Sequence, residues 1–301
     1  MLILIKMKRI LLPHGVCSDY FGYSFFAEMN ESISSAFSET IIVDFSANTW
    51  FEANLSAILG SLLSKAQENF NNILFEKIPL KQREILSRNH FLASFGGEKL
   101  EDYNNTTIKY RRNRLTDDKL IHHFLSSDLL GKEEFPKLSA AAHKEIERSI
   151  FEIFSNAIIH GNCEFVYSCG QYFPRKTPPR IDFTIVDLGN TIKYNTNNFL
   201  KAKFSGKEAI EWAVIENHTT KPKEGNIPGG LGLKIISEFV GLNKGKLQIV
   251  SADGFWELNK GIQISDTMKY EFPGTIVNIE FNLDDASFYY LTVENLEDIK
   301  F

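Results

Sequence analysis

The stretch EIFSNAIIHG, residues Glu152 to Gly161, decides the fold expected for this chain, together with three segments that follow it. DFTIVDLGNT runs from Asp182 to Thr191, PGGLGLKII from Pro228 to Ile236, and PGTIVNIEF from Pro273 to Phe281. Each segment alone has an ordinary explanation as a surface helix, a turn after a strand or a glycine-rich loop. Their order and spacing in one chain indicate a single site built from all four.

The first segment ends a run from Lys137 to His160 whose apolar spacing predicts a long helix. Glu152 and Asn156 are four residues apart, so they lie along one stripe of that helix. An Asn carbonyl oxygen suits Mg²⁺, and a Glu can orient or deprotonate a water molecule. The pair therefore suggests a catalytic Glu152 and a metal-binding Asn156; the alternative is a helix edge that simply faces water.

The second and fourth segments predict strands that end or begin at polar residues. Asp187 closes the strand Arg180 to Asp187, where its carboxylate can accept a hydrogen bond from the exocyclic amine of adenine. Gly189 would let the backbone approach the base. Thr275 opens the last strand, and its hydroxyl can reach the base through water. The alternatives are an Asp-x-Gly turn and an ordinary strand former after a turn.

The third segment places glycines before and within the start of a helical run. Its residues are Gly229, Gly230, Leu231, Gly232 and Leu233. Backbone N–H groups at a helix N-terminus attract phosphate, so we expect the phosphates of a nucleotide here. The sequence contains neither a GxxxxGK[ST] P-loop nor a complete GxGxxG fingerprint.

Joined in this order, the four segments resemble the GHKL superfamily of ATPases and kinases, which includes DNA gyrase, histidine kinases and mismatch-repair ATPases. The resemblance covers roughly residues 137–283 and implies binding of ATP and Mg²⁺. It implies that Glu152 is the catalytic base and Asn156 the Mg²⁺ ligand, with Asp187 and Gly189 in the adenine-binding box. NAIIHG is especially similar to the matching motif of anti-sigma-factor serine kinases.

The same resemblance extends to the glycine segment and the last strand. Gly230, Gly232 and Leu233 match the phosphate-side glycine box, and Thr275 matches the later adenine-side Thr. Thr191 departs from the family, because it occupies the last glycine position of the usual DxGxG. Asn190 to Ile227 would form the ATP lid, whose six lysines against four glutamates predict a mild attraction for triphosphate.

We expect three parts in the chain. Residues 1–97 alternate strand and helix patterns in a βαβαβα order and form an α/β domain that resembles the STAS domain of anti-sigma-factor antagonists. Residues 98–136 are expected to be a helical linker, and residues 137–301 a GHKL ATP-binding domain. The resemblance gives the last part a Bergerat-type α+β sandwich, with a mixed, largely antiparallel sheet covered by helices.

The expected elements follow from apolar periodicity. Strands are predicted at Lys8 to Pro13, Thr40 to Phe45, Asn72 to Ile78, Arg180 to Asp187, Lys246 to Ser251 and Thr275 to Asn282. Helices are predicted at Phe21 to Phe37, Leu55 to Gln67, Leu80 to Phe95, Asp117 to Leu130, Lys137 to His160 and Lys207 to Asn217.

Composition limits the class of protein. The 301 residues are 43% hydrophobic and 24% charged, which is typical of a folded chain. The formal charge of -5 argues against a protein that mainly coats nucleic acid, although the basic patch KYRRNR, Lys109 to Arg114, leaves local contact open. The three cysteines have no metal-ligand spacing, and no apolar stretch has the length of a membrane span or a secretory signal, so we expect a cytoplasmic protein.

Three functions remain open from the sequence. The first is a Mg²⁺-dependent ATPase that uses its nucleotide state to control a partner or an interdomain interface; the second is a protein serine/threonine kinase of the anti-sigma type. The third is a nucleotide-gated binding module with little hydrolysis, favoured because roughly 20 residues follow the last predicted strand, too few for a transducer domain.

The STAS-like domain is expected to dock a protein partner or to mediate self-association. STAS antagonists often carry a phosphorylatable Ser after a VDFS-like strand. The corresponding stretch, Thr49 to Asn54, contains none, and Ser56 lies one turn further on.

Overall fold

The structure, a computed structural model, describes residues 6–215, 218 and 231–294, with all their side chains except those of Leu115 and Leu231. The N-terminal part contains β1 (Met7–Leu11), β2 (Gly15–Val16), α1 (Tyr20–Ile33), β3 (Thr40–Asp44), β4 (Trp50–Phe51), η1 (Ala53–Leu55), α2 (Ser56–Glu68), β5 (Asn72–Glu76), α3 (Leu80–Arg88) and η2 (Leu92–Phe95). The rest contains β6 (Thr107–Asn113), η3 (Leu115–Asp117), α4 (Asp118–Phe124), η4 (Leu125–Leu129), β7 (Lys137–Leu138), α5 (Ala140–Ile159), β8 (Val166–Phe173), β9 (Arg180–Asp187), α6 (Ile192–Leu200), α7 (Gly206–Ala213), α8 (Leu231–Asn243), β10 (Lys246–Asn259), β11 (Ile262–Asn282) and β12 (Phe288–Tyr289).

The N-terminal part has the predicted alternation of strand and helix. β1, β3 and β5 form a parallel sheet in the order β1-β3-β5, with the crossover helices α1 and α2 between successive strands. Asp19 caps α1 by accepting a hydrogen bond from the Gly22 N–H over 2.8 Å. Ile41 and Val43 of β3 are fully buried in the hydrophobic cluster that also contains α1 and α2.

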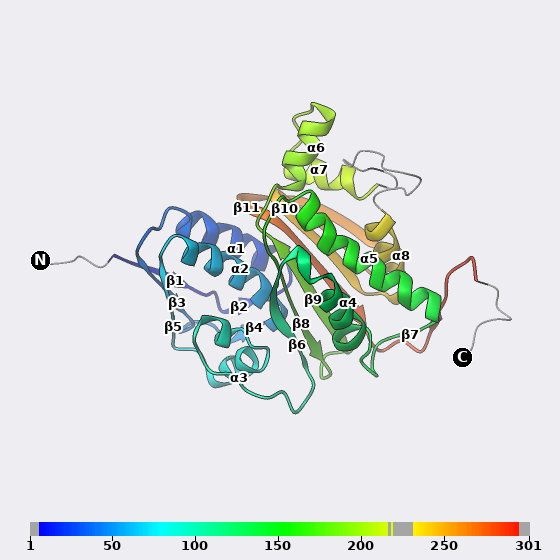
Figure 1. The fold of residues 1–301 in the computed structure, drawn as a ribbon, viewed down its shortest axis with the longest axis horizontal. Coiled ribbons are helices and arrows are strands. Elements are labelled where there is room, and N and C mark those ends of the chain that lie inside the picture. Colours follow the sequence, from blue (N-terminus) through cyan, green and yellow to red (C-terminus); the bar gives the residue numbers. More distant parts are fainter. Residues whose placement is uncertain (1–5, 216–217, 219–230, 295–301) are drawn as a thin grey trace, which may run out of the picture.

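A five-stranded antiparallel sheet in the order β10-β11-β9-β8-β6 forms the second half of the fold. Helices α4, α5 and α8 lie on one face, and α1 and α2 lie on the other (Figure 1). The pleat explains this, because Phe183 and Ile185 of β9 join the cluster under α5, whereas Val186 joins the cluster around α1 and α2. The mixture of α and β elements agrees with the expected α/β and α+β composition, but the five-stranded sheet is antiparallel in all its pairings and not mixed.

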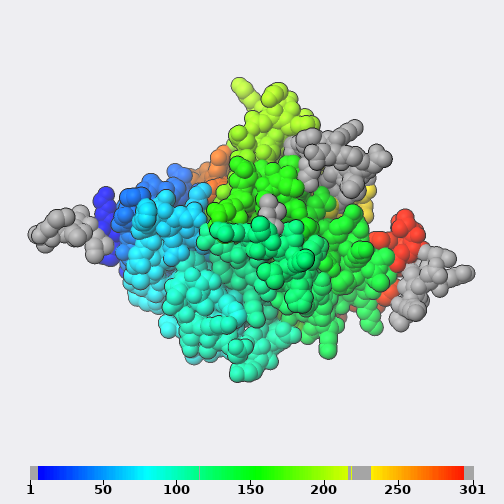
Figure 2. Space-filling model, viewed as in Figure 1, coloured from blue at the N-terminus to red at the C-terminus, as the bar shows by residue number. Residues whose placement is uncertain are grey.

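The two halves share one hydrophobic cluster. It contains Ile41 and Leu59 from the N-terminal part and Tyr167, Val186 and Phe272 from the five-stranded sheet. The molecule is therefore layered as parallel sheet, helices, antiparallel sheet and helices, with α1 and α2 packed between the two sheets (Figure 1). Figure 2 shows α6 and α7, in yellow-green, standing out from one end of these layers.

One segment departs from the expectation of a helical linker at residues 98–136. Thr107–Asn113, which contains most of KYRRNR, is the edge strand β6 of the five-stranded sheet. Ile108 and Tyr110 are buried in the clusters on opposite faces of the sheet, because a bulge lies between Ile108 and Arg111, and Lys109 is exposed. An edge strand tolerates such charged residues. The helix predicted at Asp117 to Leu130 is present as η3, α4 and the π-helical turn η4, which together run from Leu115 to Leu129.

The arginines of this basic patch are paired within the chain. Arg111 pairs with Asp128, Arg112 with Glu68 and Arg114 with Glu164. The Arg112 guanidinium also lies 3.6 Å from the ring centroid of Phe165. The three arginines of the basic patch thus form ion pairs with acidic side chains of the same chain.

Two predicted strands are longer in the structure. β10 and β11 continue beyond Ser251 and before Thr275 into a hairpin that turns at Lys260 and Gly261, both with positive φ. A bulge between Ser251 and Gly254 interrupts the alternation of apolar residues there, which explains why the periodicity ended early. α6 was not predicted, and the expected helix at Lys207 to Asn217 is α7.

Buried polar groups connect the N-terminal part to the five-stranded sheet. Asn54 Nδ2 donates to Ser18 Oγ and to Thr184 Oγ1, each over 2.9 Å. Thr184 Oγ1 donates to Asn278 Oδ1 over 2.7 Å. Asn54, in the stretch compared with the STAS phosphorylation site, therefore serves this interface. Ser56 is fully buried and accepts from Asn89 Nδ2 over 3.1 Å.

Charged side chains lie beside this network. Arg180 pairs with Glu52 at 2.8 Å and with Asp182 at 3.2 Å, and Glu280 lies 3.4 Å from both Arg180 and Lys246. Burial, with the nearby Glu280, raises the pKa of Asp182 well above its ordinary value against the opposing effect of Arg180. Arg180 and Lys246 are thus the cations that face the carboxyl groups of Glu52, Asp182 and Glu280 in this cluster.

Candidate functional site

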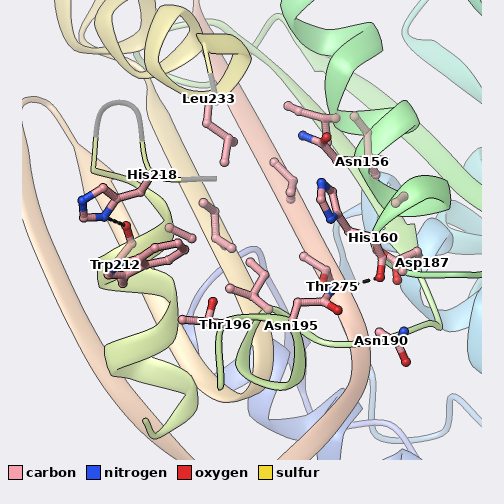
Figure 3. A pocket seen from close by; sticks show the side chains of 18 residues that line it. Asn156, His160, Asp187, Asn190, Asn195, Thr196, Trp212, His218, Leu233 and Thr275 are labelled. Atoms are coloured by element: carbon pink, nitrogen blue, oxygen red, sulfur yellow. Dashed lines mark hydrogen bonds between the residues drawn. The ribbon is translucent and has the colours of Figure 1, made fainter. Parts of the chain in front are cut away.

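A cavity of about 140 Å³ opens between α5, the five-stranded sheet and the helices α6 to α8. Asn156 from α5, Asp187 from β9, Leu233 from α8 and Thr275 from β11 all line it (Figure 3). These residues come from the four segments singled out in the sequence. The apolar part of the lining includes Ile153, Ala157, Ile185, Ile249 and Val277.

Asp187 lies at the end of β9, paired in register with Thr275 of β11. Its side chain is buried, with only 4% of the residue exposed, and it accepts a hydrogen bond from the Gly189 N–H over 3.0 Å. Burial raises the pKa of Asp187 to about 7, while hydrogen bonds from the backbone of Gly189 and Thr275 act in the opposite direction. A buried acid with a shifted pKa at the wall of a cavity is typical of a binding or catalytic site.

Backbone segments crowd around Asp187, and this explains Gly189 and Gly274. A Cβ on Gly189 would lie 2.1 Å from the Gly161 carbonyl oxygen, and a Cβ on Gly274 would lie 2.0 Å from the Asp187 carbonyl oxygen. The Asn190 N–H also donates to the Gly161 carbonyl over 2.6 Å. Gly189 thus lets the backbone after β9 approach Gly161, which lies in the loop that follows α5.

Asn156 reaches the cavity from the last turn of α5. Its Oδ1 atom is buried and has no hydrogen-bond partner within the described part of the chain. Leaving a buried acceptor unpaired costs about 1–3 kcal/mol, so a ligand that engages this oxygen is favoured. A carbonyl oxygen of this kind suits Mg²⁺, and the donor atom therefore fits the metal implied by the family resemblance.

No group of three or more His, Cys, Asp or Glu side chains that could hold a metal ion occurs among the described residues. A Mg²⁺ ion at Asn156 would therefore take most of its ligands from a nucleotide and from water, as is common for this ion in phosphate sites.

Glu152 lies one turn before Asn156 and contacts the start of α8. The Gly232 N–H donates to Glu152 Oε2 over 3.0 Å, and a Cβ on Gly232 would lie 2.8 Å from the same oxygen. The carboxylate therefore sits against an N–H group at a helix N-terminus, where negative charge is stabilised. Of the predicted glycine segment, Gly229 and Gly230 lie outside the described residues, and Leu231 is the first residue of α8.

Thr191, the departure from the family pattern, has a local role. Its side chain caps α6 by accepting a hydrogen bond from the Tyr194 N–H over 3.1 Å. The Ile192 N–H donates to Ser251 Oγ over 2.9 Å, and Ser251 Oγ lies 3.1 Å from Thr275 Oγ1. The hydroxyl of Thr275 is thus part of the connection between α6 and the sheet.

The predicted lid is anchored to the sheet through a β-bulge. Lys193 Nζ lies 3.0 Å from Asp253 and 2.7 Å from Glu271, and the Gly206 N–H donates to Asp253 Oδ1 over 2.9 Å. Two carboxylates therefore pair with the Lys193 ammonium group. This lysine is less free to attract triphosphate than the sequence predicts. Two other predicted lid lysines, Lys221 and Lys223, lie outside the described residues.

Several cavity residues were not singled out for binding in the sequence. They are Asn195 and Thr196 of α6, Trp212 of α7, His218 and His160. Asn195 Nδ2 donates to the His160 carbonyl over 3.0 Å and ties α6 to the end of α5. A lone Trp on a short helix carries no motif, so only the position of α7 reveals it.

Comparison with protein-family models, with curated proteins and with solved structures finds no match to this chain. In the part that the structure describes, no helix combines the length and the apolar character needed to cross a membrane.

Proposed function

We propose that this chain binds ATP and Mg²⁺ in the cavity beside α5 and hydrolyses the nucleotide, with Glu152 as the general base. One observation carries the proposal: Asn156, Asp187, Leu233 and Thr275, from four separate segments, line a single cavity. Membership of the GHKL superfamily is part of this proposal and is supported by the same four segments. A STAS-like N-terminal part is also proposed, from the alternation of strands and helices there.

The cavity offers a different group to each part of the nucleotide. Asp187 can accept a hydrogen bond from the exocyclic amine of adenine, and the aliphatic side chains on the sheet can cover the base. Asn156 Oδ1 would hold Mg²⁺, which when bound neutralises the triphosphate charge. The N-terminus of α8, at Gly232, would attract phosphate.

Glu152 would take a proton from water as the water oxygen bonds to the γ-phosphorus and the bond to the β-phosphate oxygen breaks, releasing ADP. The contact between Glu152 and the Gly232 N–H has a consequence for this step. A triphosphate at the start of α8 competes with the carboxylate for the same donor, so binding and release of the base are linked.

The test is incubation with γ-labelled ATP and Mg²⁺, resolving free phosphate from phosphoprotein. We expect Glu152→Gln to slow phosphate release by about 100-fold or more, the range found for loss of a general base. We expect ATP affinity to be retained or increased, because a negative charge beside the phosphate site is removed. Glu145→Gln is the matched control, since this residue lies on the same helix and pairs with Arg148.

Asn156→Ala should abolish the difference between ATP titrations with Mg²⁺ and with EDTA. Absence of ATP binding by the wild-type chain would refute the proposal. If Glu152→Gln released phosphate at the wild-type rate, Glu152 would not be the base.

A nucleotide-gated binding module is the second candidate, and the Glu152 contact favours it. The Gly232 N–H occupies Glu152 Oε2, so until that contact opens only the other carboxylate oxygen can meet a water molecule. ATP binding without phosphate release would indicate this module. Label on protein would instead indicate the serine/threonine kinase suggested by NAIIHG, with the N-terminal part as the element that docks a protein partner.

A further inference from the structure

Trp212 holds a distinctive position in the cavity. It lies on α7, near the C-terminal end of the helix, and Figure 3 shows it across the cavity from Asn156 and His160. Apart from Asp187 and Thr275, the sheet lines the cavity with aliphatic side chains, including Ile185 and Ile249. Trp212 is therefore the one large flat side chain that the described residues offer to a ligand there.

Other side chains hold the indole in place. The rings of Trp212 and His218 are stacked, with centroids 4.7 Å apart and an interplanar angle of 28°. His218 Nδ1 also lies 2.9 Å from the Trp212 carbonyl oxygen. The Phe199 ring of α6 lies 6.2 Å from the indole. A side chain held in this way loses little conformational entropy when a ligand binds.

The helix that carries Trp212 is itself fixed against the sheet. Gly206, its first residue, approaches Gly254 of β10 so closely that a Cβ on Gly206 would lie 2.4 Å from the Gly254 nitrogen. Ala209 and Ile210 of α7 are fully buried. The position of the indole relative to Asp187 is thus set by backbone contacts.

We propose that Trp212 stacks on the base of the bound nucleotide, so that Asp187 recognises the edge of the base and Trp212 its face. This inference rests on the proposed function and adds a specificity-determining residue to it. The ligand class is a purine nucleotide, because a planar, two-ring base gains most from a flat aromatic wall. The triphosphate lies towards α8 and does not contact the indole.

Tryptophan fluorescence provides a direct test, because the chain contains only Trp50, Trp212 and Trp256. Trp50 lies on β4 in the N-terminal part, and Trp256 is buried at 2% exposure. We expect ATP with Mg²⁺ to change the emission of the wild-type chain and of Trp50→Phe. Trp212→Phe should lose most of that change while its ATP affinity stays within about threefold, since Phe also stacks.

Affinity measurements separate stacking from a general packing role. Trp212→Ala should weaken ATP binding by about 10- to 100-fold, and Trp212→Leu, which keeps apolar volume without a ring, should also weaken it. Binding of inorganic tripolyphosphate with Mg²⁺ should be unchanged in both variants. Wild-type ATP affinity in Trp212→Ala and Trp212→Leu would overturn the inference and leave the proposed function intact.

Two further outcomes are equally decisive. Loss of tripolyphosphate binding together with ATP binding would show that Trp212 supports the fold of the site, and would overturn stacking. Absence of ATP binding by the wild-type chain would overturn the proposed function and this inference with it.

Discussion

Asp182 and Asp187 lie on the same strand, β9, and both are buried, yet they face opposite sides of the five-stranded sheet. Asp182 faces the N-terminal part and pairs with Arg180 at 3.2 Å. Asp187 faces the cavity, where backbone N–H groups are the partners that oppose the effect of burial on its pKa. Burial raises the pKa of both carboxyl groups.

The difference lies in what surrounds each acid. Around Asp182, the neighbours are the charged side chains of Arg180, Glu52 and Glu280. The residue therefore connects two parts of the fold. Around Asp187 there is space, and the neighbouring Asn156 has an unpaired oxygen. Two equally buried acids thus have different partners, which supports a structural role for Asp182 and the proposed ligand binding for Asp187.

Removing the guanidinium of Arg180 from the network should cause the largest loss of stability. Arg180→Ala leaves Glu52, Asp182 and Glu280 without their shared guanidinium, and we expect a loss of about 3 kcal/mol in the free energy of unfolding. Urea denaturation measures it. Arg175→Ala, in the exposed loop before β9, is the control and should change stability by less than about 0.5 kcal/mol.

A loss below about 1 kcal/mol for Arg180→Ala would mean that the network contributes little to holding the two halves together. It would also weaken the contrast between the two faces of the sheet.

Asp187→Asn should stabilise the protein in a pH-dependent way. The folded-state pKa of Asp187 is about 7, above its ordinary value of 3.8, so the folded state binds the proton more tightly than the unfolded state. That preference contributes fully below about pH 4 and is lost as pH rises towards and through 7. At pH 8 the variant should be about 4 kcal/mol more stable than wild type, and at pH 4 nearly equal to it.

Unfolding curves at pH 4, 6 and 8 test this expectation. The same variant should bind ATP less tightly, because an Asn side chain can turn only one acceptor oxygen towards the base. A stability difference that stays constant with pH would show that Asp187 is not held with a raised pKa. It would remove the basis for treating the acid as a special feature of the cavity face.

The sequence predicted the cavity face of the five-stranded sheet, which carries Asp187, better than the network face, which carries Asp182 and Thr184. Glu152 and Asn156 are spaced for one helical stripe, and Asp187 ends an apolar strand. The order of the segments and their resemblance to a known family then predicted that the helix and the strand share one site. The strands β1, β3 and β5 and the helices α1 and α2 also lie within a few residues of their predicted bounds, whereas α3 ends at Arg88, before the predicted Phe95. These features depend on short-range periodicity, which a single sequence displays.

Contacts between distant segments could not be predicted in this way. Arg180 meets Glu52 only because α1 and α2 pack on the back of the five-stranded sheet, and nothing local to either residue indicates it. β6 was hidden because basic residues on an edge strand resemble a solvated linker. Trp212 reaches the cavity through the placement of α7 on β10, which depends on the Gly206–Gly254 contact.

Two threonines offer the finest comparison of the faces, with the smallest expected effects. Thr184 Oγ1 bridges Asn54 and Asn278 on the network face, so Thr184→Val leaves buried amides short of a partner and should cost about 1–2 kcal/mol without changing ATP affinity. Thr275 Oγ1 lies 3.1 Å from Ser251 Oγ on the cavity face, and Ser251 keeps its bond to the Gly274 carbonyl. Thr275→Val should therefore cost less than about 1 kcal/mol and weaken ATP binding a few-fold. Urea denaturation and ATP titration of both variants measure the pair, and the reverse pattern would contradict the assignment of the two faces.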